Sequence, residues 1–171
     1  MCILFSAVNK HEQYPIIIAT NRDEFNIRET IPANYHLFEQ DVKLMAELGL
    51  KAYRFSIAWP RIQPSGEGEP NLAGISFYNK LIDCLIQHEI EPWITLYHWD
   101  LPENFMSQGG WKNRDTTKWF ADFTDVIMRK FSDRLHSIAT KNEPWCVSWL
   151  SHYLGEQAPG ERSIESGVKT M

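Results

Sequence analysis

The chain has little cysteine and no surplus of positive charge. Only three of its 171 residues are cysteine, Cys2, Cys84 and Cys146, and an odd number of widely separated thiols does not suggest a disulfide framework. We therefore expect a reducing, cytoplasmic environment. The 17 basic and 22 acidic side chains give a formal net charge of -5, which argues against a dedicated nucleic-acid-binding protein.

Long apolar runs and cofactor motifs are also missing. The run Ile16 to Ala19 has four residues, far below the roughly 20 that a membrane-spanning helix needs, and no basic leader precedes it. We expect neither secretion nor membrane insertion. The glycines at 66, 68 and 74 fit neither the dinucleotide-binding pattern nor the P-loop pattern. The six histidines never combine a two-His metal-ligand spacing with a nearby third ligand. No cofactor and no metal is therefore expected.

What the sequence does have is an ordinary globular composition with many aromatic residues. Hydrophobic residues at 43% and charged residues at 23% lie near the averages of folded domains, which argues against disorder. A length of 171 residues suits one compact domain rather than two. Seven Trp, six Tyr and nine Phe leave many rings to place, in the core or in a binding site.

From about residue 35, segments with apolar residues three or four apart alternate with short β-rich runs. Gly49 is expected to end the first helix and Asp115 to cap the third. This alternation favours right-handed parallel βαβ units and an α/β fold. Residues 1–8 and 14–20 instead look like two strands of a β-hairpin. The predicted helices cover 37–48, 77–86, 115–131 and 146–154, and the predicted strands cover 52–59, 92–100 and 138–143.

Each predicted strand ends in a cluster of polar residues and Trp, and such ends converge on one side of a parallel sheet. Glu143, in the run KNEPW, is the main candidate for chemistry. Aromatic rings around a carboxylic acid disfavour its charged form, as a proton donor requires. Asn142 beside it is suited to a substrate hydroxyl. A solvent-exposed Glu at a strand end is an equally weighted alternative.

The run HWD and a strand arginine supply further candidates. His98 and Asp100 lie two apart, on one face of the predicted strand, and with Trp99 they offer polar donors beside a flat ring, which suits a sugar. A core histidine and a capping aspartate explain the run as well. Arg54 lies in mid-strand, where a buried guanidinium needs a carboxylate such as Glu143, unless the strand is an edge and Arg54 faces water.

Residues 35–161 resemble the family 1 glycoside hydrolases, the β-glucosidase family. The matching runs are DVKLMAELGLKAYRFSIAWPRI, FYNKLIDCLI, PWITLYHWDLP, GGWKNRDT, DRLHSIATKNEPW and LGEQAPGE. The resemblance implies a (β/α)8 TIM barrel and retaining hydrolysis of a β-linked glucoside. It implies that Glu143 is the acid/base, that Asn142, His98 and Trp99 bind the sugar, and that Arg54 supports the nucleophilic carboxylate.

The chain departs from that family in several places. The TENG run that carries the family's nucleophile does not occur in the sequence, and neither does the opening strand. Gln157 stands where the family usually has His, and Lys141 occupies a strand position that is usually apolar. About three βα units of a partial barrel are expected, with open edges that favour self-association.

The N-terminus resembles another family. MCILFSAVNKHEQYPIIIATNRDEF is similar to the start of the NRDE-motif family, associated with transport and Golgi organisation, in which Cys2 would match an N-terminal nucleophile and 21–24 the motif. A small buried strand residue is the other interpretation of Cys2.

We expect a hairpin fragment over 1–33 and a partial glycoside hydrolase barrel over 34–171. Three functions stay open: a truncated β-glucosidase, a non-catalytic sugar-binding or fusion product, and an amidohydrolase acting through Cys2.

Overall fold

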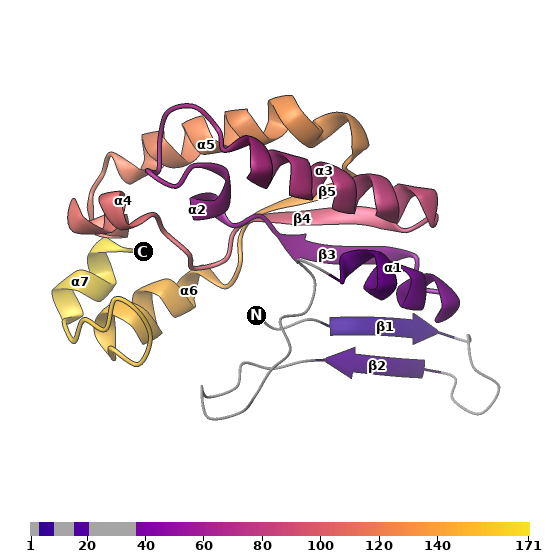
Figure 1. Ribbon diagram of the computed structural model, residues 1–171. Coiled ribbons are helices and arrows are strands. Elements are labelled where there is room, and N and C mark those ends of the chain that lie inside the picture. The colour runs from indigo at the N-terminus through magenta and orange to yellow at the C-terminus, as the bar shows by residue number, and fades with distance from the viewer. Residues whose placement is uncertain (1–3, 9–15, 21–36) are drawn as a thin grey trace. The chain divides into compact units, whose positions relative to one another are not determined.

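A computed structural model describes residues 4–8, 16–20 and 37–171 of the chain (Figure 1). Cys2, the NRDE run at 21–24 and the expected domain boundary near residues 31–34 lie outside the described residues. The elements are β1 (Leu4–Val8), β2 (Ile16–Thr20), α1 (Phe38–Glu47), β3 (Ala52–Ser56), α2 (Trp59–Ile62), α3 (Leu72–Gln87), β4 (Glu91–Tyr97), α4 (Glu103–Ser107), η1 (Gly110–Lys112), α5 (Thr116–Phe131), η2 (Ser132–Arg134), β5 (Ser137–Lys141), α6 (Pro144–Cys146), the π-helical segment η3 (Val147–Tyr153) and α7 (Ile164–Lys169).

The two N-terminal strands form the predicted hairpin. β1 and β2 pair antiparallel, with Leu4 opposite Thr20 and Val8 opposite Ile16. Figure 1 shows the two arrows running in opposite directions. The polar turn between two short β-rich runs was therefore a sufficient signal for this pairing.

The other three strands form one sheet in the order β3-β4-β5. Before β3, the carbonyl of Lys51 accepts a hydrogen bond from the amide of Glu91. After β3, six residues past Lys51, the amide of Ile57 donates to the carbonyl of Thr95. Partners that advance together along both strands define a parallel pair. The same holds for β4 and β5, since His136 donates to Pro92 and Asn142 donates to Tyr97. The predicted parallel βα units are confirmed.

The strands end earlier than the sequence predicted. β3 ends at Ser56, and the short helix α2 begins three residues later at Trp59, with Pro60 in its first turn, where the missing amide leaves no hydrogen bond unmade. β4 ends at Tyr97 and β5 at Lys141. His98, Asp100, Asn142 and Glu143 thus follow their strands instead of belonging to them, and the expected two-residue alternation in HWD is wrong.

The helices agree better with their predicted ranges. α1 and α5 match, α3 begins at Leu72, five residues before its predicted start, and Gly49 ends the first helix with a positive φ of 74°. The expected hydrogen bond from the Asp115 cap is not made, because its carboxylate pairs with Lys118 instead, at 2.9 Å. The predicted helix 146–154 is divided into α6 and the π-helical η3.

The chain divides into two compact units. The first contains residues 1–55, 76–94 and 133–137, and the second contains 56–75, 95–132 and 138–171. In the first, Phe38 packs edge-on against Phe77 and Phe55 stacks on Tyr78. Tyr53 and Phe55 are buried while Arg54 between them is exposed, as expected for the outer strand of a sheet.

The core of the second unit is built on Trp59. Its indole is fully buried, stacks on Phe123 with the ring centres 4.7 Å apart, and packs edge-on against Phe105 at 5.4 Å. The indole N–H donates to the carbonyl of Gly66. The expectation that Trp59 belongs to a ligand-binding cluster is wrong, since the turn into α2 directs it into the core.

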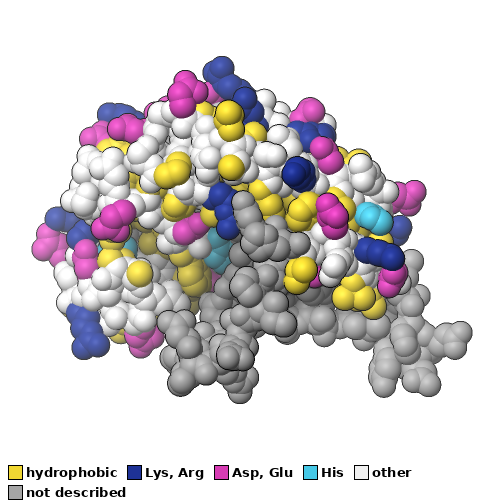
Figure 2. Space-filling model, viewed as in Figure 1, with side chains coloured by type: hydrophobic (Ala, Val, Ile, Leu, Met, Phe, Trp, Pro, Cys, Tyr) yellow, Lys and Arg dark blue, Asp and Glu magenta, His cyan; other side chains and the backbone are white. Residues whose placement is uncertain are grey.

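Hydrophobic side chains also reach the surface. Figure 2 shows them between charged side chains on one face of the molecule. No helix among the described residues has the length and hydropathy needed to cross a membrane. The large exposed apolar residues include Leu72, Trp93, Ile138, Trp145, Trp149 and Val168.

Replacing Trp59 by leucine should destabilise the second unit strongly. The substitution removes a buried ring, its stack on Phe123 and the hydrogen bond to Gly66, and large-to-small changes of this kind cost about 3 to 5 kcal/mol. Urea denaturation followed by far-UV circular dichroism measures the loss. Trp149→Leu, at an exposed tryptophan, is the matched control and should cost about 1 kcal/mol or less. Equal losses in the two variants would contradict a core built on Trp59.

Candidate functional site

The candidate residues of the second unit lie where the parallel ladder ends. The amide of Ile57 donates to Thr95 and the amide of Asn142 donates to Tyr97, both at 2.9 Å. The chain segments that follow β3, β4 and β5 therefore start side by side at one edge of the sheet. That edge is the carboxyl end of the strands, where α/β folds place ligands.

His98 and Trp99 connect these segments. The ring Nδ1 of His98 lies 2.7 Å from the hydroxyl of Ser56, the last residue of β3. The indole N–H of Trp99 donates to the backbone carbonyl of Asn142 at 2.9 Å. Both side chains are half-buried, and their rings meet edge to face with centres 5.4 Å apart. The sequence predicted this grouping, and the structure brings the three segments together.

The backbone at this edge is unusual. Trp99 has a φ of 81° and Glu143 a φ of 41°, values in the left-handed region that side-chain-bearing residues rarely adopt. Such conformations persist only where the surrounding structure holds them, and they gather at functional sites. Two of the three non-glycine residues with positive φ among the described residues follow adjacent strands at this edge, and the third, Glu89, precedes β4.

Glu143 does not have the environment that the sequence analysis expected. Its side chain is exposed, as are Pro144 and Trp145. The described contact of the carboxylate is with the thiol of Cys146, which donates to Oε2 at 3.4 Å. Burial, and secondly this hydrogen bond, raise the pKa of that thiol. The prediction of an acid enclosed by aromatic rings is therefore wrong for this chain, since both Glu143 and the neighbouring Trp145 are exposed.

Arg54 and Asn142, two further predicted site residues, differ in burial and in the unit to which they belong. Asn142 is half-buried and its carbonyl holds Trp99 in place. Arg54 is exposed on β3 and belongs to the first compact unit, so the alternative of an edge-strand arginine applies and a buried guanidinium is not found.

Asp100 is a titratable group that the sequence analysis treated only as part of HWD. Burial raises the pKa of Asp100 to about 6, against the lowering effect of backbone hydrogen bonds from Asp100 and His98 and of the charge on Arg61. A carboxyl group that can be protonated near neutral pH at the ligand-binding edge of a sheet is a candidate for a functional role.

Lys141 is the second residue with an unexpected setting. Its ammonium group lies 3.4 Å from the centre of the Trp111 ring, a cation–π contact, and burial lowers the pKa of the amine. The run GGWKN contains Trp111, but no local pattern announces its partner 30 residues later. Two aromatic rings of the second unit, Trp111 and Phe120, thus lie within reach of the Lys141 amine.

Among the residues that the structure describes, no three His, Cys, Asp or Glu side chains gather as a metal site would require. The arrangement can instead present a carboxyl group, an amide, an imidazole and an indole at one sheet edge. These groups donate and accept hydrogen bonds beside a flat ring, which is the combination that a sugar can use.

Comparisons with known proteins point the same way. The chain matches the profile described as Glycosyl hydrolase family 1 over residues 12–171. It is 47% identical over 136 residues to Beta-glucosidase A of Acetivibrio thermocellus, covering 80% of this chain and 30% of that protein. It is 46% identical over 138 residues to a Beta-glucosidase of Agrobacterium sp., covering 81% and 30%.

A solved structure of a family 1 β-glucosidase from Thermotoga maritima superposes with a TM-score of 0.79 at 44% identity. The alignment covers 80% of this chain and 31% of that one. The chain thus spans about 30% of the length of the relatives it matches. Its three parallel strands with their helices are part of a (β/α)8 barrel. The family match covers most of the chain and the structural match carries the same name, so the chain belongs to glycosyl hydrolase family 1.

Proposed function

We propose that this chain supplies the acid/base part of a β-glucosidase-type site that hydrolyses β-linked glucosides with retention. The observation that carries the proposal is Glu143, held in a left-handed conformation at the carboxyl end of β5. Asn142 beside it is tied to Trp99 at the end of the neighbouring strand. A carboxyl group at the strand end of a partial barrel is where this family's fold keeps its chemistry.

In the proposed reaction, Glu143 donates a proton to the glycosidic oxygen as the bond to the sugar breaks. In the second half it accepts a proton from the water that attacks the anomeric carbon. The carboxylate that forms the covalent intermediate comes from elsewhere, because the sequence contains no TENG run. This chain by itself is therefore expected to lack the covalent route.

The neighbouring residues would hold the sugar. The side-chain amide of Asn142 is suited to the 2-hydroxyl, and His98 and Trp99 offer an imidazole and a ring face at the end of β4. Support comes from a relative, since the Thermotoga maritima β-glucosidase has been solved in complex with deoxynojirimycin and with castanospermine. From the family resemblance, we propose that Arg54 of β3 supports the nucleophilic carboxylate.

Asp100 would act on this site through its neighbours. Its carboxyl group accepts hydrogen bonds from the backbone of His98 and faces the charge of Arg61. We infer a positioning role: Asp100 holds the turn that carries His98 and Trp99. Its titration would then change the stability of the turn without any contact with substrate.

A sugar-binding role without chemistry is the second candidate. Trp145 is 56% exposed and, with Trp99, offers an accessible ring at the sheet edge. Trp59 cannot take part, because it is buried. Affinity for cellobiose without turnover would favour this candidate over hydrolysis.

For residues 1–33 we propose a hairpin-based segment that is separate from the barrel portion at 34–171. The antiparallel pairing of β1 with β2 supports it, since a barrel of this family is built from parallel strands. The resemblance of this segment to the NRDE-motif family, with Cys2 as its nucleophile, belongs to the same proposal. The family match begins at residue 12 and so overlaps this segment.

The role of Glu143 can be tested in a closed barrel. Residues 37–171 would replace the matching segment of the Thermotoga maritima β-glucosidase, and Glu143→Gln would be compared with the unsubstituted chimera. We expect kcat/KM for phenyl β-glucoside to fall about 100-fold or more, since general acid catalysis contributes that much. The fall for 2,4-dinitrophenyl β-glucoside should be much smaller, because that leaving group needs no proton.

Glu156→Gln, at an exposed glutamate of the same segment, is the matched control for this comparison. It should leave both rates unchanged. A Glu143→Gln chimera that loses equal factors on the two substrates, or loses nothing, would remove Glu143 from the acid/base role.

Asp100 predicts a pH-dependent stability. Its pKa is about 6 in the folded protein against 3.8 for the free group, so the folded state binds more protons than the unfolded state between about pH 4 and pH 6. Stability therefore falls as the pH rises through this window. Asp100→Asn should raise the stability at about pH 7.5 by up to about 3 kcal/mol, with little effect near pH 4.

Urea denaturation at the two pH values measures this difference. Asp122→Asn, at an exposed aspartate of α5, is the control and should keep the pH dependence of the unsubstituted chain. If Asp100→Asn showed that same dependence, the assignment of the titration to Asp100 would fail.

The separation of the N-terminal segment predicts the effect of a deletion. Removing residues 1–33 should change the free energy of unfolding of the remainder by only about 0.5 kcal/mol. Urea denaturation of the two chains makes the comparison, and mass spectrometry of the full chain shows whether Met1 is removed to expose the amine of Cys2. A loss of several kcal/mol would mean that residues 1–33 are part of the barrel fold.

A further inference from the structure

A cavity of about 340 Å³ lies within the second unit, and Glu143 is not among the residues that line it. Its volume falls in the range of small-molecule sites and is more than twice the roughly 150 Å³ that accommodates benzene. The walls are mostly aromatic and apolar. They include Tyr97, Trp99, Met106, Trp111, His152 and Pro159.

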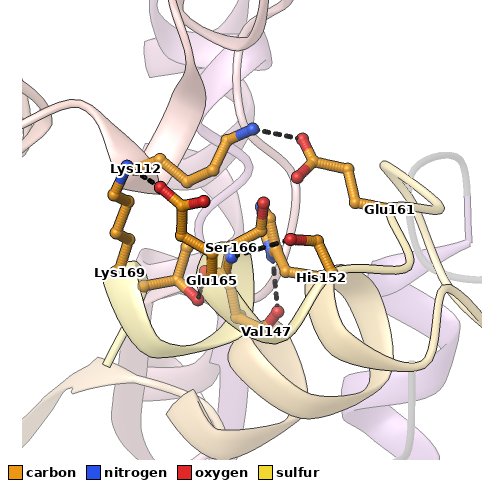
Figure 3. A network of polar contacts seen from close by, with 9 residues as sticks. Lys112, Val147, His152, Glu161, Glu165, Ser166 and Lys169 are labelled. Atoms are coloured by element: carbon orange, nitrogen blue, oxygen red, sulfur yellow. Dashed lines mark hydrogen bonds and ion pairs between the residues drawn. The ribbon is translucent and has the colours of Figure 1, made fainter.

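His152 gives this cavity a polar group. The side chain is only 2% exposed. Its Nδ1 lies 2.7 Å from the carbonyl oxygen of Val147, and since a carbonyl only accepts, Nδ1 carries the hydrogen (Figure 3). In the neutral ring, Nε2 is then an acceptor with a lone pair. No described residue donates to Nε2.

An acceptor buried without a donor is unusual, because the large majority of buried polar atoms are paired. A molecule in the cavity that donates one hydrogen bond would satisfy it. The remaining walls favour a ring, since rings pack well edge-on or offset against Trp and Tyr. Glu103, the carboxylate among the lining residues, disfavours an anionic ligand.

The walls are held in place by contacts among themselves. Lys112, next to Trp111 in the sequence, forms an ion pair with Glu161 at 2.5 Å. Figure 3 shows the two side chains pointing toward each other. The amide of Glu161 donates to Ser151, and the amide of Ser163 donates to the carbonyl of His152. The hydrogen bond from Lys112 also lowers the pKa of Glu161. The cavity is therefore formed before any ligand enters.

We propose that this cavity binds a small uncharged aromatic alcohol. The hydroxyl donates to Nε2 of His152, and the ring packs among Trp99, Trp111 and Tyr97. A sugar fits less well, because its several hydroxyl groups would meet mostly apolar walls. The site is separate from the acid/base assignment and does not depend on it, although Trp99 contributes to both.

Phenol and toluene form the matched pair of probes, since they share a ring and differ in the hydroxyl group. Each is titrated into the full chain with ¹⁵N-labelled histidine, and binding is followed by the Nε2 resonance of His152 and by tryptophan fluorescence. Phenol should bind about five- to tenfold more tightly, the usual value of one hydrogen bond. The Nε2 resonance should shift with phenol and stay unchanged with toluene.

His152→Phe provides the second test. It removes the acceptor and keeps a ring, so phenol should lose its advantage while toluene binds as before. His88→Phe, at an exposed histidine, is the control and should leave both affinities unchanged. If His152→Phe does not fold, the comparison of phenol with toluene in the unsubstituted chain still decides the question.

Two outcomes would overturn the proposal. Equal affinities for phenol and toluene would remove His152 as the acceptor. Absence of binding by either probe would mean that the cavity is not a ligand site and that an internal water satisfies Nε2.

Discussion

The parallel pairing of three strands is the constraint on which the site depends. In a parallel sheet every strand runs the same way, so the segments leaving β3, β4 and β5 must start from one edge. The last hydrogen bonds of the ladder, from Ile57 to Thr95 and from Asn142 to Tyr97, align those starts. The contact between Trp99 and the carbonyl of Asn142 then joins two of the segments directly. Residues more than 40 positions apart are neighbours for this reason alone.

Position and environment are separate matters at this edge. Glu143 lies at the strand end with a constrained backbone, yet its carboxyl group is exposed. A proton donor needs cover from several directions, and in a closed barrel the other strands and loops supply it. This chain spans about 30% of the length of its relatives and supplies three parallel strands of the sheet.

The second unit shows how an aromatic-rich sequence divides its rings. Trp59 and Phe123 are buried and stacked in the core, while Trp145 faces solvent next to Glu143. Trp111 has a third role, because its ring face contacts the amine of Lys141 and its side chain also lines the cavity. A ring can serve as core, as a partner for a cation or as a wall of a cavity, and only its surroundings decide which.

Much of this was predictable from the sequence because it depends on local chemistry. The helical spacing of apolar residues located α1, α3 and α5, and alternating β-rich runs located the parallel strands. The runs HWD and KNEPW marked two strand ends. These features depend on neighbours within a few positions, so no knowledge of the distant chain was needed.

Tertiary structure decided the rest, since burial and charge environment depend on residues from distant segments. Whether Trp59 faced a ligand or the core depended on the turn made by Pro60, and whether Glu143 was enclosed depended on how many strands surround it. The acidity of Asp100, the ring beneath Lys141 and the unpaired nitrogen of His152 arise from contacts across the second unit. The sequence by itself determined which groups stand at the end of each strand; the packing of the strands determined which of them are exposed, which are charged and which lack a partner.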